Sequence, residues 1–351
     1  METILNPYYG LLVLFLCLIY PYERASKKNK DRMMWLLLVL LTLFFGLRGP
    51  VGDDYDNYRA MYNHESFTHI FSMPAFALAM ELFNALHIPF EGFIFATSCL
   101  INGLLFRCMY RQQGNLPFLL SIFWGMSGVV NEIDFVRNTI SILLFANSWY
   151  YIQEDKPLKF FLMNILGALC HYSALLYLPF YYLVKKTLPS KIYLGIIITS
   201  ILLFFLKIPF LNFIPRLFPS DSELADHIYK YISTYTRAIP FTIAFIERLL
   251  TAIAIFICYE KLISDKITRT AVYTFLSLIL SYALFSNYGI LGTRIANLFI
   301  PCYWVLWPAL LRQVNNKGFR LVAAAGIYIY LFIRILTIVL MAKWHYTTIF
   351  T

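Results

Sequence analysis

The chain has 351 residues, of which 60% are hydrophobic and only 14% are charged. A soluble domain carries about 25% charged residues, so this composition excludes an ordinary water-facing surface. The net charge of +10 would suggest nucleic acid in a soluble protein, but here the basic residues lie in short breaks between apolar runs, and we expect no nucleic-acid partner. The composition therefore predicts an all-α, polytopic, multi-pass membrane protein.

Apolar runs recur along the whole chain and are separated by short polar breaks. A helix needs about 20 apolar residues to cross a bilayer, and most of the runs approach that length. We therefore predict about twelve transmembrane helices in a single integral membrane domain over residues 1–351. The predicted runs are residues 5–22, 33–48, 90–107, 116–131, 137–152, 158–171, 173–185, 190–206, 241–259, 271–287, 295–312 and 319–341.

The positions of the basic residues predict how these helices are oriented. Six breaks hold 18 of the 29 Lys and Arg residues, and all six fall on one side if each run crosses once. Cytoplasmic loops carry an excess of Lys and Arg, so this side is expected to be cytoplasmic and both termini to lie outside. The six breaks are residues 22–32, 107–116, 153–159, 185–191, 259–270 and 312–320.

Two external loops, residues 49–89 and 207–240, are longer than the other breaks. The first contains the apolar stretch 74–88, which is too short to span and is expected to form an interfacial or re-entrant helix. The second contains the stretch Asp221–Arg237, which has the pattern of a short amphipathic helix. Both loops therefore place polar residues at the external membrane surface.

The first external loop opens with a polar segment directly after the second run. Glycine and proline break the helix here and allow the backbone to turn tightly. Three aspartates and two tyrosines follow, and a solvated helix stop is the alternative interpretation. The acidic cluster lacks the spacing and the distal Glu of a calcium loop, so no metal site is predicted. The segment reads Arg48-Gly49-Pro50-Val51-Gly52-Asp53-Asp54-Tyr55-Asp56-Asn57-Tyr58.

Three further polar residues occur at the external ends of apolar runs. Arg137 opens a run, and Glu132 and Asp134 before it are candidate partners. A guanidinium at this depth suits a phosphate, with interfacial snorkelling as the alternative. His171 ends a run and is a candidate for proton transfer or for a structural hydrogen bond. Arg294 follows a glycine-containing turn and begins a run in the same way as Arg137.

These external ends share one chemical character. Arg48, Arg137, Arg294 and His171 all fall at the depth of the outer leaflet edge, and acids and tyrosines accompany them. Charged residues within a membrane are costly and usually line a cavity or a site. We therefore expect the guanidinium groups to converge on an externally opening, cationic cavity. Its natural ligand is a lipid-linked phosphate or pyrophosphate whose tail stays in lipid.

At these residues the sequence resembles the EpsG family of bacterial exopolysaccharide proteins, which is grouped with Wzy-type O-antigen polymerases. The family pattern is an Arg and then Val-Gly-x-Asp-Tyr-x-x-Tyr, followed by Ile-Arg-Gln-x-x-Ala, by His-x-Ser-Ala and by a late Arg that begins a helix. The sequence departs from this pattern at Asn138, where the family has Gln, and at Ser141, where it has Ala. The matching positions are Arg48, Val51-Gly52, Asp54-Tyr55, Tyr58, Val136-Arg137-Asn138, His171-Tyr172-Ser173-Ala174 and Arg294.

The resemblance implies a glycosyltransferase with a GT-C-like helical fold and both termini periplasmic, in the bacterial inner membrane. Such a polymerase joins undecaprenyl-pyrophosphate-linked oligosaccharide repeat units into O-antigen or exopolysaccharide at the periplasmic face. The resemblance implies no cofactor, no nucleotide sugar and no metal. Membrane lipid is a further partner, and the resemblance leaves open a polysaccharide co-polymerase that regulates chain length.

A mechanism consistent with these residues assigns each of them a role. Arginines would hold the donor pyrophosphate and stabilise the leaving group, and either Asp54 or His171 would accept the proton of the acceptor hydroxyl. Tyrosines would contact the sugars, and the loop 207–240 would cover the cavity. The catalytic candidates are Asp54, His171, Arg137 and Arg294, and the substrate-binding candidates are Arg48, Asp53, Tyr55, Tyr58 and Arg237.

Other functions remain open at this stage. An O-antigen ligase would share the arginines and a His with a polymerase, and a membrane acyltransferase is a further enzyme alternative. A lipid-linked oligosaccharide flippase or transporter would spread its charges through the midplane and show an internal repeat. Here the cations collect near one face of the predicted bundle, and no repeat is visible, which favours an enzyme.

Overall fold

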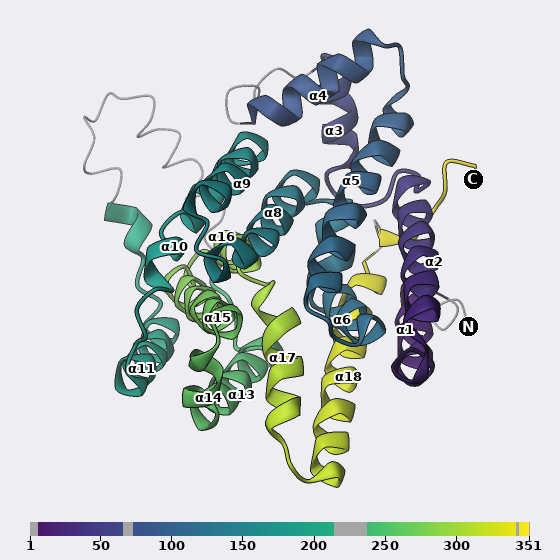
Figure 1. Ribbon diagram of the computed structural model, residues 1–351. Coiled ribbons are helices and arrows are strands. Elements are labelled where there is room, and N and C mark those ends of the chain that lie inside the picture. The colour runs from purple at the N-terminus through teal and green to yellow at the C-terminus, as the bar shows by residue number, and fades with distance from the viewer. Residues whose placement is uncertain (1–5, 66–72, 214–236, 342–343, 351) are drawn as a thin grey trace. The chain divides into compact units, whose positions relative to one another are not determined.

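The computed structural model describes residues 6–65, 73–213, 237–341 and 344–350 (Figure 1). Within these residues the regular structure is helical, apart from an isolated antiparallel bridge between Arg48 and Thr348. The prediction of an all-helical protein is therefore confirmed. The chain forms two compact units, Met1–Tyr181 with Val314–Thr351, and Tyr182–Gln313. That the two belong to one membrane domain stays a prediction.

The first unit is a bundle in which α2 packs along α5, α5 along α8, and α8 along α9 (Figure 1). A π-helical turn, η2, interrupts α6 and α7, and a 3-10 turn, η3, follows α9. Its helices are α1 (Pro7–Arg24), α2 (Lys27–Gly46), α3 (Tyr55–Tyr62), α4 (Pro74–Ala85), α5 (Phe90–Arg111), α6 (Leu116–Phe123), η2 (Trp124–Gly128), α7 (Val129–Ile133), α8 (Val136–Gln153), α9 (Pro157–Cys170), η3 (Tyr172–Tyr177) and α18 (Lys317–Val339).

The second unit is arranged around α15, which packs against α11, α16 and α17. The short helix α10 (Phe180–Leu183) lies at the boundary where this unit begins. The helices of the second unit are α11 (Ser190–Leu206), η4 (Phe210–Phe213), α13 (Ile243–Ile257), α14 (Tyr259–Ser264), α15 (Lys266–Leu284), α16 (Gly289–Asn297) and α17 (Cys302–Gln313).

Several helices begin at residues that cap them chemically. Ser26 accepts a hydrogen bond from the N–H of Asn29 at the start of α2, and Asn115 accepts one from the N–H of Phe118 at the start of α6. These side chains satisfy N–H groups that have no partner within the helix. Since both caps come from the predicted polar breaks, the breaks fix where the helices start.

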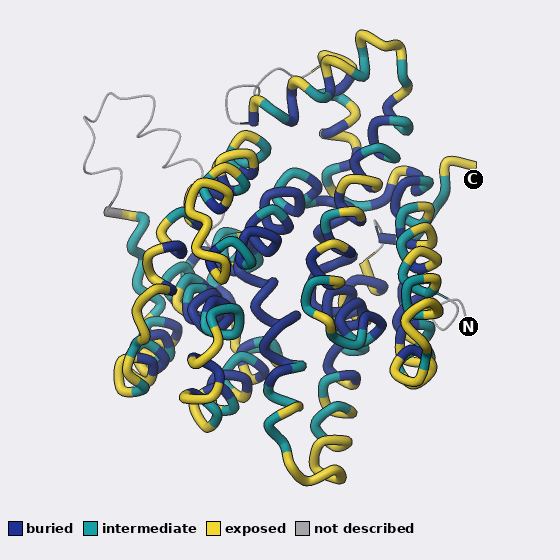
Figure 2. The backbone as a smooth tube through the Cα atoms, in the orientation of Figure 1, coloured by how far each residue is buried: buried dark blue, intermediate teal, exposed yellow. Residues whose placement is uncertain are grey.

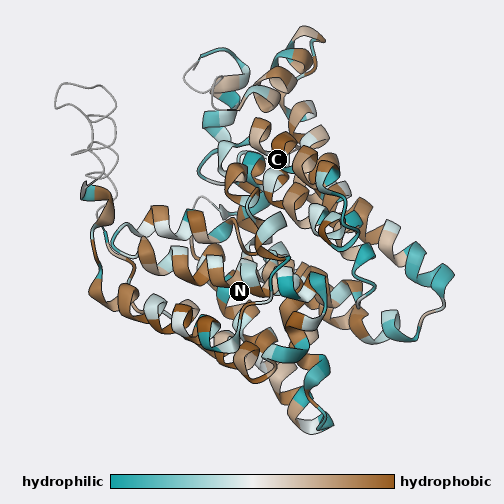
Figure 3. Cartoon of the chain, turned by 60° about the vertical axis from the view of Figure 1, so that its left-hand side comes forward, coloured by the Kyte–Doolittle hydropathy of each residue, from teal (hydrophilic) through white to brown (hydrophobic). Residues whose placement is uncertain are grey.

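The structure supports a membrane-embedded protein. Among the described residues, four helices are long and apolar enough to cross a membrane, or five if the bent pair α16 and α17 counts as one span. Hydrophobic residues cover most of the helices (Figure 3). Exposed residues recur along the outer helices, including α2 (Figure 2). Many of the exposed residues are large and apolar, such as Leu36 on α2, which is 70% exposed. The predicted number of about twelve crossings is not confirmed.

The less regular regions agree with the sequence only in part. The apolar stretch 74–88 forms the short helix α4, of 12 residues. The chain breaks at His171 as predicted, but the run 173–185 contains the six-residue turn η3 and the four-residue α10 in place of one continuous helix. The predicted amphipathic helix Asp221–Arg237 lies outside the described residues, except for Arg237.

Candidate functional site

The turn after α2 is held by the side chain of Arg48. Its Nη1 donates to the carbonyl oxygen of Phe45 at 2.7 Å, and its Nη2 donates to the carbonyl oxygen of Ile133 at 3.3 Å. Arg48 is only 2% exposed. The guanidinium therefore joins the end of α2 to the break between α7 and α8, where carbonyl groups are not used by a helix. Arg48, a predicted ligand of the pyrophosphate, is thus buried and donates to backbone carbonyl groups.

Gly52 is required where the turn meets this break. Its φ is +95°, and a Cβ atom at this position would lie 2.2 Å from Oδ1 of Asp134. Asp134 needs that close approach because its Oδ1 accepts hydrogen bonds from the N–H groups of Asp53, at 2.8 Å, and Asp54, at 3.2 Å. Asp134 follows the candidate span Leu116–Ile133, and burial raises the pKa of its carboxyl to about 6.

The helix α3 begins immediately after these two aspartates and turns its tyrosines inward. Tyr55, Tyr58 and Tyr62 recur at helical spacing and are 6%, 3% and 4% exposed. The hydroxyl of Tyr58 donates to the carbonyl oxygen of Asp134 at 3.0 Å. The position expected for Tyr55 and Tyr58, stacked on sugars at an open mouth, therefore differs from their observed packing inside the unit. Asp53 is exposed and Asp54 is half-buried.

Arg137 lies against the same tyrosine on the first turn of α8. Its Nε donates to the hydroxyl oxygen of Tyr58 at 3.3 Å, and its Cζ lies 5.3 Å from the centroid of that ring. Nη1 contacts the sulfur of Met73. The side chain is half-buried, and within the described part of the chain Nη2 is neither hydrogen-bonded nor enclosed. Arg137 is thus oriented through one edge and keeps donors for an anion.

The acids before Arg137 have partners other than its guanidinium. Oε2 of Glu132 accepts from the side-chain amide of Asn102 at 3.1 Å, and Glu132 is only 1% exposed. Asp134 binds the backbone of the α3 entrance instead. Neither acid forms an ion pair with Arg137 in the part of the chain that the structure describes, so the suggestion that they pair with it is wrong.

The segment around His171 adjoins the start of α8. Nδ1 of His171 accepts from the backbone N–H of Ser173 at 3.3 Å and lies 2.7 Å from the Ser173 hydroxyl. That hydroxyl lies 3.5 Å from Oδ1 of Asn138, the neighbour of Arg137. Because Nδ1 acts as an acceptor, the proton of a neutral imidazole is assigned to Nε2. His171 itself is half-buried.

The small residues of the family pattern explain how α8 and α9 come close here. The hydroxyl of Ser141 donates to the carbonyl oxygen of Gly167 at 2.7 Å. A Cβ atom on Gly167 would lie 3.3 Å from Cβ of Ala174 and 3.5 Å from Cα of Ser141. This close packing carries the His171 segment to the first turns of α8, and it explains why a small side chain stands at position 141.

The C-terminal segment packs against the Arg48 turn, a contact that the sequence analysis did not predict. The ring of Tyr346 stacks on Phe44 with centroids 4.2 Å apart, and its hydroxyl donates to the carbonyl oxygen of Phe44 at 2.6 Å. The N–H of Gly49 donates to the carbonyl oxygen of Thr347 at 2.9 Å. A Cβ atom on Gly49 would lie 2.7 Å from Oγ1 of Thr347. The role of residues 344–350 follows from these contacts in the folded protein, and no motif in the sequence indicates it.

A second arginine supports the broken helix from the other side. Nη2 of Arg334, on α18, donates to the carbonyl oxygen of Met126 at 3.0 Å, within the π-helical turn η2. Together with Arg48, it supplies donors to carbonyl groups on both sides of α7. Short π-helical segments often occur at functional sites. The two guanidinium groups therefore stabilise the segment that delivers Asp134 and Arg137.

Arg237 and Arg294 belong to the second unit. The carbonyl oxygen of Arg237 accepts from the N–H of Gly289 at 2.8 Å, at the start of the helix that carries Arg294. Both arginine side chains are exposed. The predicted convergence of Arg294 with the arginines of the first unit stays a prediction.

The second unit also contains the adjacent charges Glu247 and Arg248, which use different partners. Glu247 accepts from the hydroxyls of Thr251, at 2.8 Å, and Tyr303, at 3.1 Å. The guanidinium of Arg248 lies over the ring of Tyr282, with Cζ 3.6 Å from its centroid. Because the two residues are adjacent in α13, their side chains point to different faces of the helix and use separate partners.

Within the first unit, three of the four sequence motifs meet at one junction. Asp134 joins the Gly52 turn to α8, Tyr58 joins α3 to Arg137, and Ser173 joins the His171 segment to Asn138. Around this junction Asp53 is exposed, and Asp54, Arg137 and His171 are half-buried. A cation with nearby carboxylates can bind a phosphate and accept a proton.

Comparison with known proteins gives a family match that covers most of the chain. The model of the EpsG family matches residues 31–349, which include all four motifs. No curated protein matches the chain, and no solved structure matches it either.

Proposed function

Because the chain belongs to the EpsG family, we propose that it polymerises polysaccharide by joining undecaprenyl-pyrophosphate-linked oligosaccharide repeat units at the periplasmic face of the bacterial inner membrane. Family membership supports a polymerase-type glycosyltransferase in general, and the apolar helices support a membrane-embedded one. The lipid-linked substrates, the O-antigen or exopolysaccharide product and the GT-C-like fold are parts of the proposal.

The observation that carries the proposal is the setting of Arg137. Its Nε is held by Tyr58, whereas Nη2 is open to a ligand. A guanidinium that is oriented in advance stabilises developing negative charge without reorganising during the reaction. A charge-assisted hydrogen bond from Nη2 to a pyrophosphate oxygen is the contact that this setting allows. Arg137 would therefore bind the donor pyrophosphate and stabilise it as it leaves.

The chemical step follows from these positions. The acceptor hydroxyl oxygen forms a bond to the anomeric carbon of the donor sugar, and the bond between that carbon and the pyrophosphate oxygen breaks. The lipid pyrophosphate leaves with the electron pair, and Arg137 stabilises its charge. The hydroxyl proton passes to a carboxylate. Membrane lipid surrounds the prenyl chains throughout, so only the polar ends need to reach the junction.

We assign the proton acceptor to Asp54 in preference to His171. Asp54 is half-buried at the entrance of α3, and within the described ranges its Oδ1 accepts from the side chain of Asn57, at 3.1 Å. Nδ1 of His171 is already an acceptor for Ser173, which leaves its Nε2 protonated in the neutral form. A protonated Nε2 is suited to donate to a phosphate oxygen, and His171 would supply that donor.

The remaining candidates take supporting roles in the proposal. Arg48 and Tyr58 are positioning residues, because they are buried and hold the turn and Arg137 in place. Tyr55 packs against Phe90 and supports α3. Asp53, which is exposed, is the substrate-binding candidate of the first unit. Arg294 and Arg237 of the second unit are proposed to bind substrate. Each is tested by its own Ala variant, separately from Arg137.

The proposal is tested in a strain that lacks the chromosomal copy and carries plasmid-encoded variants. With Arg137→Ala, glycan chains are expected to be lost while single repeat units remain attached, because the donor pyrophosphate is no longer stabilised. Arg59→Ala is the matched control, since Arg59 is an exposed arginine on α3 of the same unit. Glycans separated by gel show the chain lengths, and wild-type lengths with Arg137→Ala would overturn the assignment.

The same gel separates the polymerase from its alternatives. A ligase would lose all attached glycan, including the single repeat unit, when its function is removed. A flippase would leave repeat units on the cytoplasmic side and also yield no attached single unit. Retention of exactly one unit is therefore specific to loss of polymerisation. A co-polymerase that regulates chain length would instead change the distribution of lengths without abolishing polymer.

A further inference from the structure

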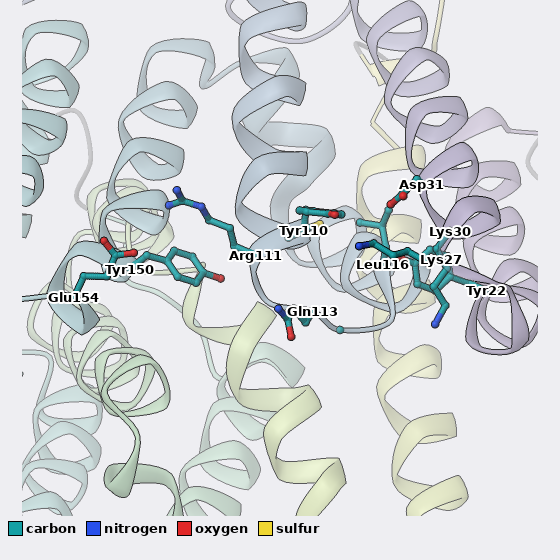
Figure 4. A pocket seen from close by; sticks show the side chains of 12 residues that line it. Tyr22, Lys27, Lys30, Asp31, Tyr110, Arg111, Gln113, Leu116, Tyr150 and Glu154 are labelled. Atoms are coloured by element: carbon teal, nitrogen blue, oxygen red, sulfur yellow. The ribbon is translucent and has the colours of Figure 1, made fainter.

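A hollow of about 530 Å³ lies at the other end of α2 from the motif junction (Figure 4). Since α2 has 20 residues, its two ends are about 30 Å apart, which is the thickness of a bilayer core. The hollow belongs entirely to the first unit. It is lined by Tyr22, Lys27, Lys30, Asp31, Met109, Tyr110, Arg111, Gln113, Gly114, Leu116, Tyr150 and Glu154.

The hollow is formed where three predicted polar breaks come together. Lys27, Lys30 and Asp31 line it from α2, Arg111 and Gln113 from the end of α5, and Tyr150 and Glu154 from α8 (Figure 4). These breaks are among those that the loop charges assign to the cytoplasm. A ligand in the hollow would therefore approach from the cytoplasmic side, opposite to the proposed polymerisation site.

Its cations are held by aromatic rings and keep donors for a ligand. Cζ of Arg111 lies 5.1 Å from the centroid of Tyr150, and Nζ of Lys30 lies 5.5 Å from the centroid of Tyr22. Nη1 of Arg111 is enclosed and has no hydrogen-bond partner among the described residues. An enclosed donor without an acceptor is costly, and a ligand oxygen would relieve that cost.

The charges of the lining match a headgroup with one negative charge. Three cations, Lys27, Lys30 and Arg111, face two carboxylates, Asp31 and Glu154, and the latter is also paired with Lys156 at 2.7 Å. One net positive charge suits a phosphodiester, whereas a nucleoside di- or triphosphate would bring several negative charges. The carboxylates would accept hydrogen bonds from hydroxyl groups beside the phosphate, and the amide of Gln113 can both accept and donate.

The position of the hollow along α2 matches the membrane–water interface. Trp35 lies one helical turn after Asp31 and is 61% exposed. Exposed tryptophan is typical of the interface, and the next residues, such as Leu36 and Val39, present apolar side chains outwards at 70% and 53% exposure. Acyl chains can therefore lie along α2 while a headgroup enters the hollow.

From these observations we propose that the hollow binds the headgroup of an anionic glycerophospholipid, such as phosphatidylglycerol, from the cytoplasmic leaflet. Arg111 and Lys30 contact the phosphodiester, and Asp31 and Gln113 contact the headgroup hydroxyls. Basic pockets between membrane helices are known sites for anionic lipid headgroups. The inference does not depend on the polymerase proposal, because no residue of the hollow belongs to the motif junction.

The test is the thermal unfolding of the purified full-length protein in a neutral detergent. Dioctanoyl-phosphatidylglycerol is expected to raise the unfolding midpoint in a saturable manner, since a ligand that binds the folded state stabilises it. Dioctanoyl-phosphatidylcholine, dioctanoyl-phosphatidylethanolamine and inorganic phosphate at the same concentrations are the comparison probes, and none is expected to shift the midpoint.

Variants assign that shift to the hollow. Arg111→Gln is expected to weaken the response to phosphatidylglycerol by about tenfold or more. Lys30→Gln is the second variant and is expected to weaken it severalfold, because an ammonium lacks the paired donors of a guanidinium. Lys28→Gln is the matched control, because Lys28 is an exposed lysine of the same break that does not line the hollow.

Three results would overturn the inference. Equal stabilisation by phosphatidylcholine or phosphatidylethanolamine would show general lipid binding. Saturable stabilisation by inorganic phosphate alone would show a site for a soluble anion. An unchanged response to phosphatidylglycerol in both Arg111→Gln and Lys30→Gln would place the lipid elsewhere.

Discussion

The two ends of α2 use cationic residues in different ways. At the Gly46 end, Arg48 is buried and donates to backbone carbonyls, and Arg137 is oriented by a buried tyrosine. At the Lys27 end, the cations lie along the wall of a hollow and contact aromatic rings. The first arrangement fixes geometry through hydrogen bonds, as a reaction requires, and the second provides charge and volume, as a lipid headgroup requires. Under the two proposals, the catalytic arginine is held by hydrogen bonds, whereas the lipid-binding cations lie against aromatic rings in a hollow.

The most severe predicted change at the Gly46 end is Gly52→Ala. The residue has a φ of +95°, and the new Cβ would meet Oδ1 of Asp134 at 2.2 Å. Backbone strain and displacement of Asp134 together should cost about 4 kcal/mol or more of stability. Thermal unfolding in detergent measures the loss. Gly103→Ala is the control, since nothing lies within 4 Å of a Cβ there, and an equal loss in the two variants would break the comparison.

Asp134→Ala should have the next largest effect, because the N–H groups of Asp53 and Asp54 both lose their acceptor. Each unsatisfied buried group costs about 1–3 kcal/mol. Because both N–H groups are only partly buried, we expect the lower part of the summed range, about 2–4 kcal/mol, together with loss of polymer. Asp134→Asn keeps a carbonyl oxygen as acceptor and should lose about 1 kcal/mol. Equal losses for Ala and Asn would mean that Asp134 is not the acceptor that orders the turn.

The sequence analysis predicted only part of this junction. The motif pattern singled out Arg137, His171 and the Gly52 turn, because residue types at fixed spacing are visible in one chain. It did not indicate that Asp134 would bind the backbone of Asp53 and Asp54, since that contact depends on tertiary packing across about 80 residues. The all-helical class followed from composition. The helix break at η2 depends on a hydrogen-bond donor from a distant residue, because Arg334 donates to the carbonyl oxygen of Met126.

Burial also explains why some site predictions differ from the structure. Arg48 and Tyr58 read as membrane-surface residues in a linear sequence because they follow a helix end. In the fold, the turn at Gly52 brings α3 back against the bundle and encloses both side chains. Linear position thus indicated that these residues belong to one region of the fold, and it did not indicate that Arg48 and Tyr58 are buried.

Tyr346→Ala should weaken the same end from the C-terminal side. The change removes a stacked ring and a hydrogen bond to Phe44, which together should contribute about 1–3 kcal/mol. Unfolding temperature and polymer length are the two readouts, and both should fall moderately. Phe350→Ala is the control because that ring is 79% exposed. An unchanged Tyr346→Ala protein would show that the C-terminal segment does not support the turn.

The smallest predicted effect is a pH dependence that arises from Asp134. Its folded pKa of about 6 lies above the ordinary value of 3.8, so the folded protein binds this proton more tightly than the unfolded chain. The stabilising contribution is therefore complete at low pH and decreases as the pH rises through about 6. Between pH 5 and pH 7 the loss should be about 1 kcal/mol.

The pH dependence is measured as the difference in unfolding midpoint between the wild-type protein and Asp134→Asn across this range. Converted to a free energy of unfolding, the difference between the two proteins should change by about 1 kcal/mol from pH 5 to pH 7, because the amide of Asn does not titrate. A constant difference between pH 5 and pH 7 would assign any pH dependence of stability to other groups.

The most direct test of the central claim is turnover of defined lipid-linked repeat units by the purified protein. The wild-type protein and Arg59→Ala should produce a ladder of products at equal rates, with or without a chelator. Arg137→Ala should be slower by about 100-fold or more, because a lost charge-stabilising donor has an effect of that size. Wild-type turnover by a folded Arg137→Ala protein would contradict the account.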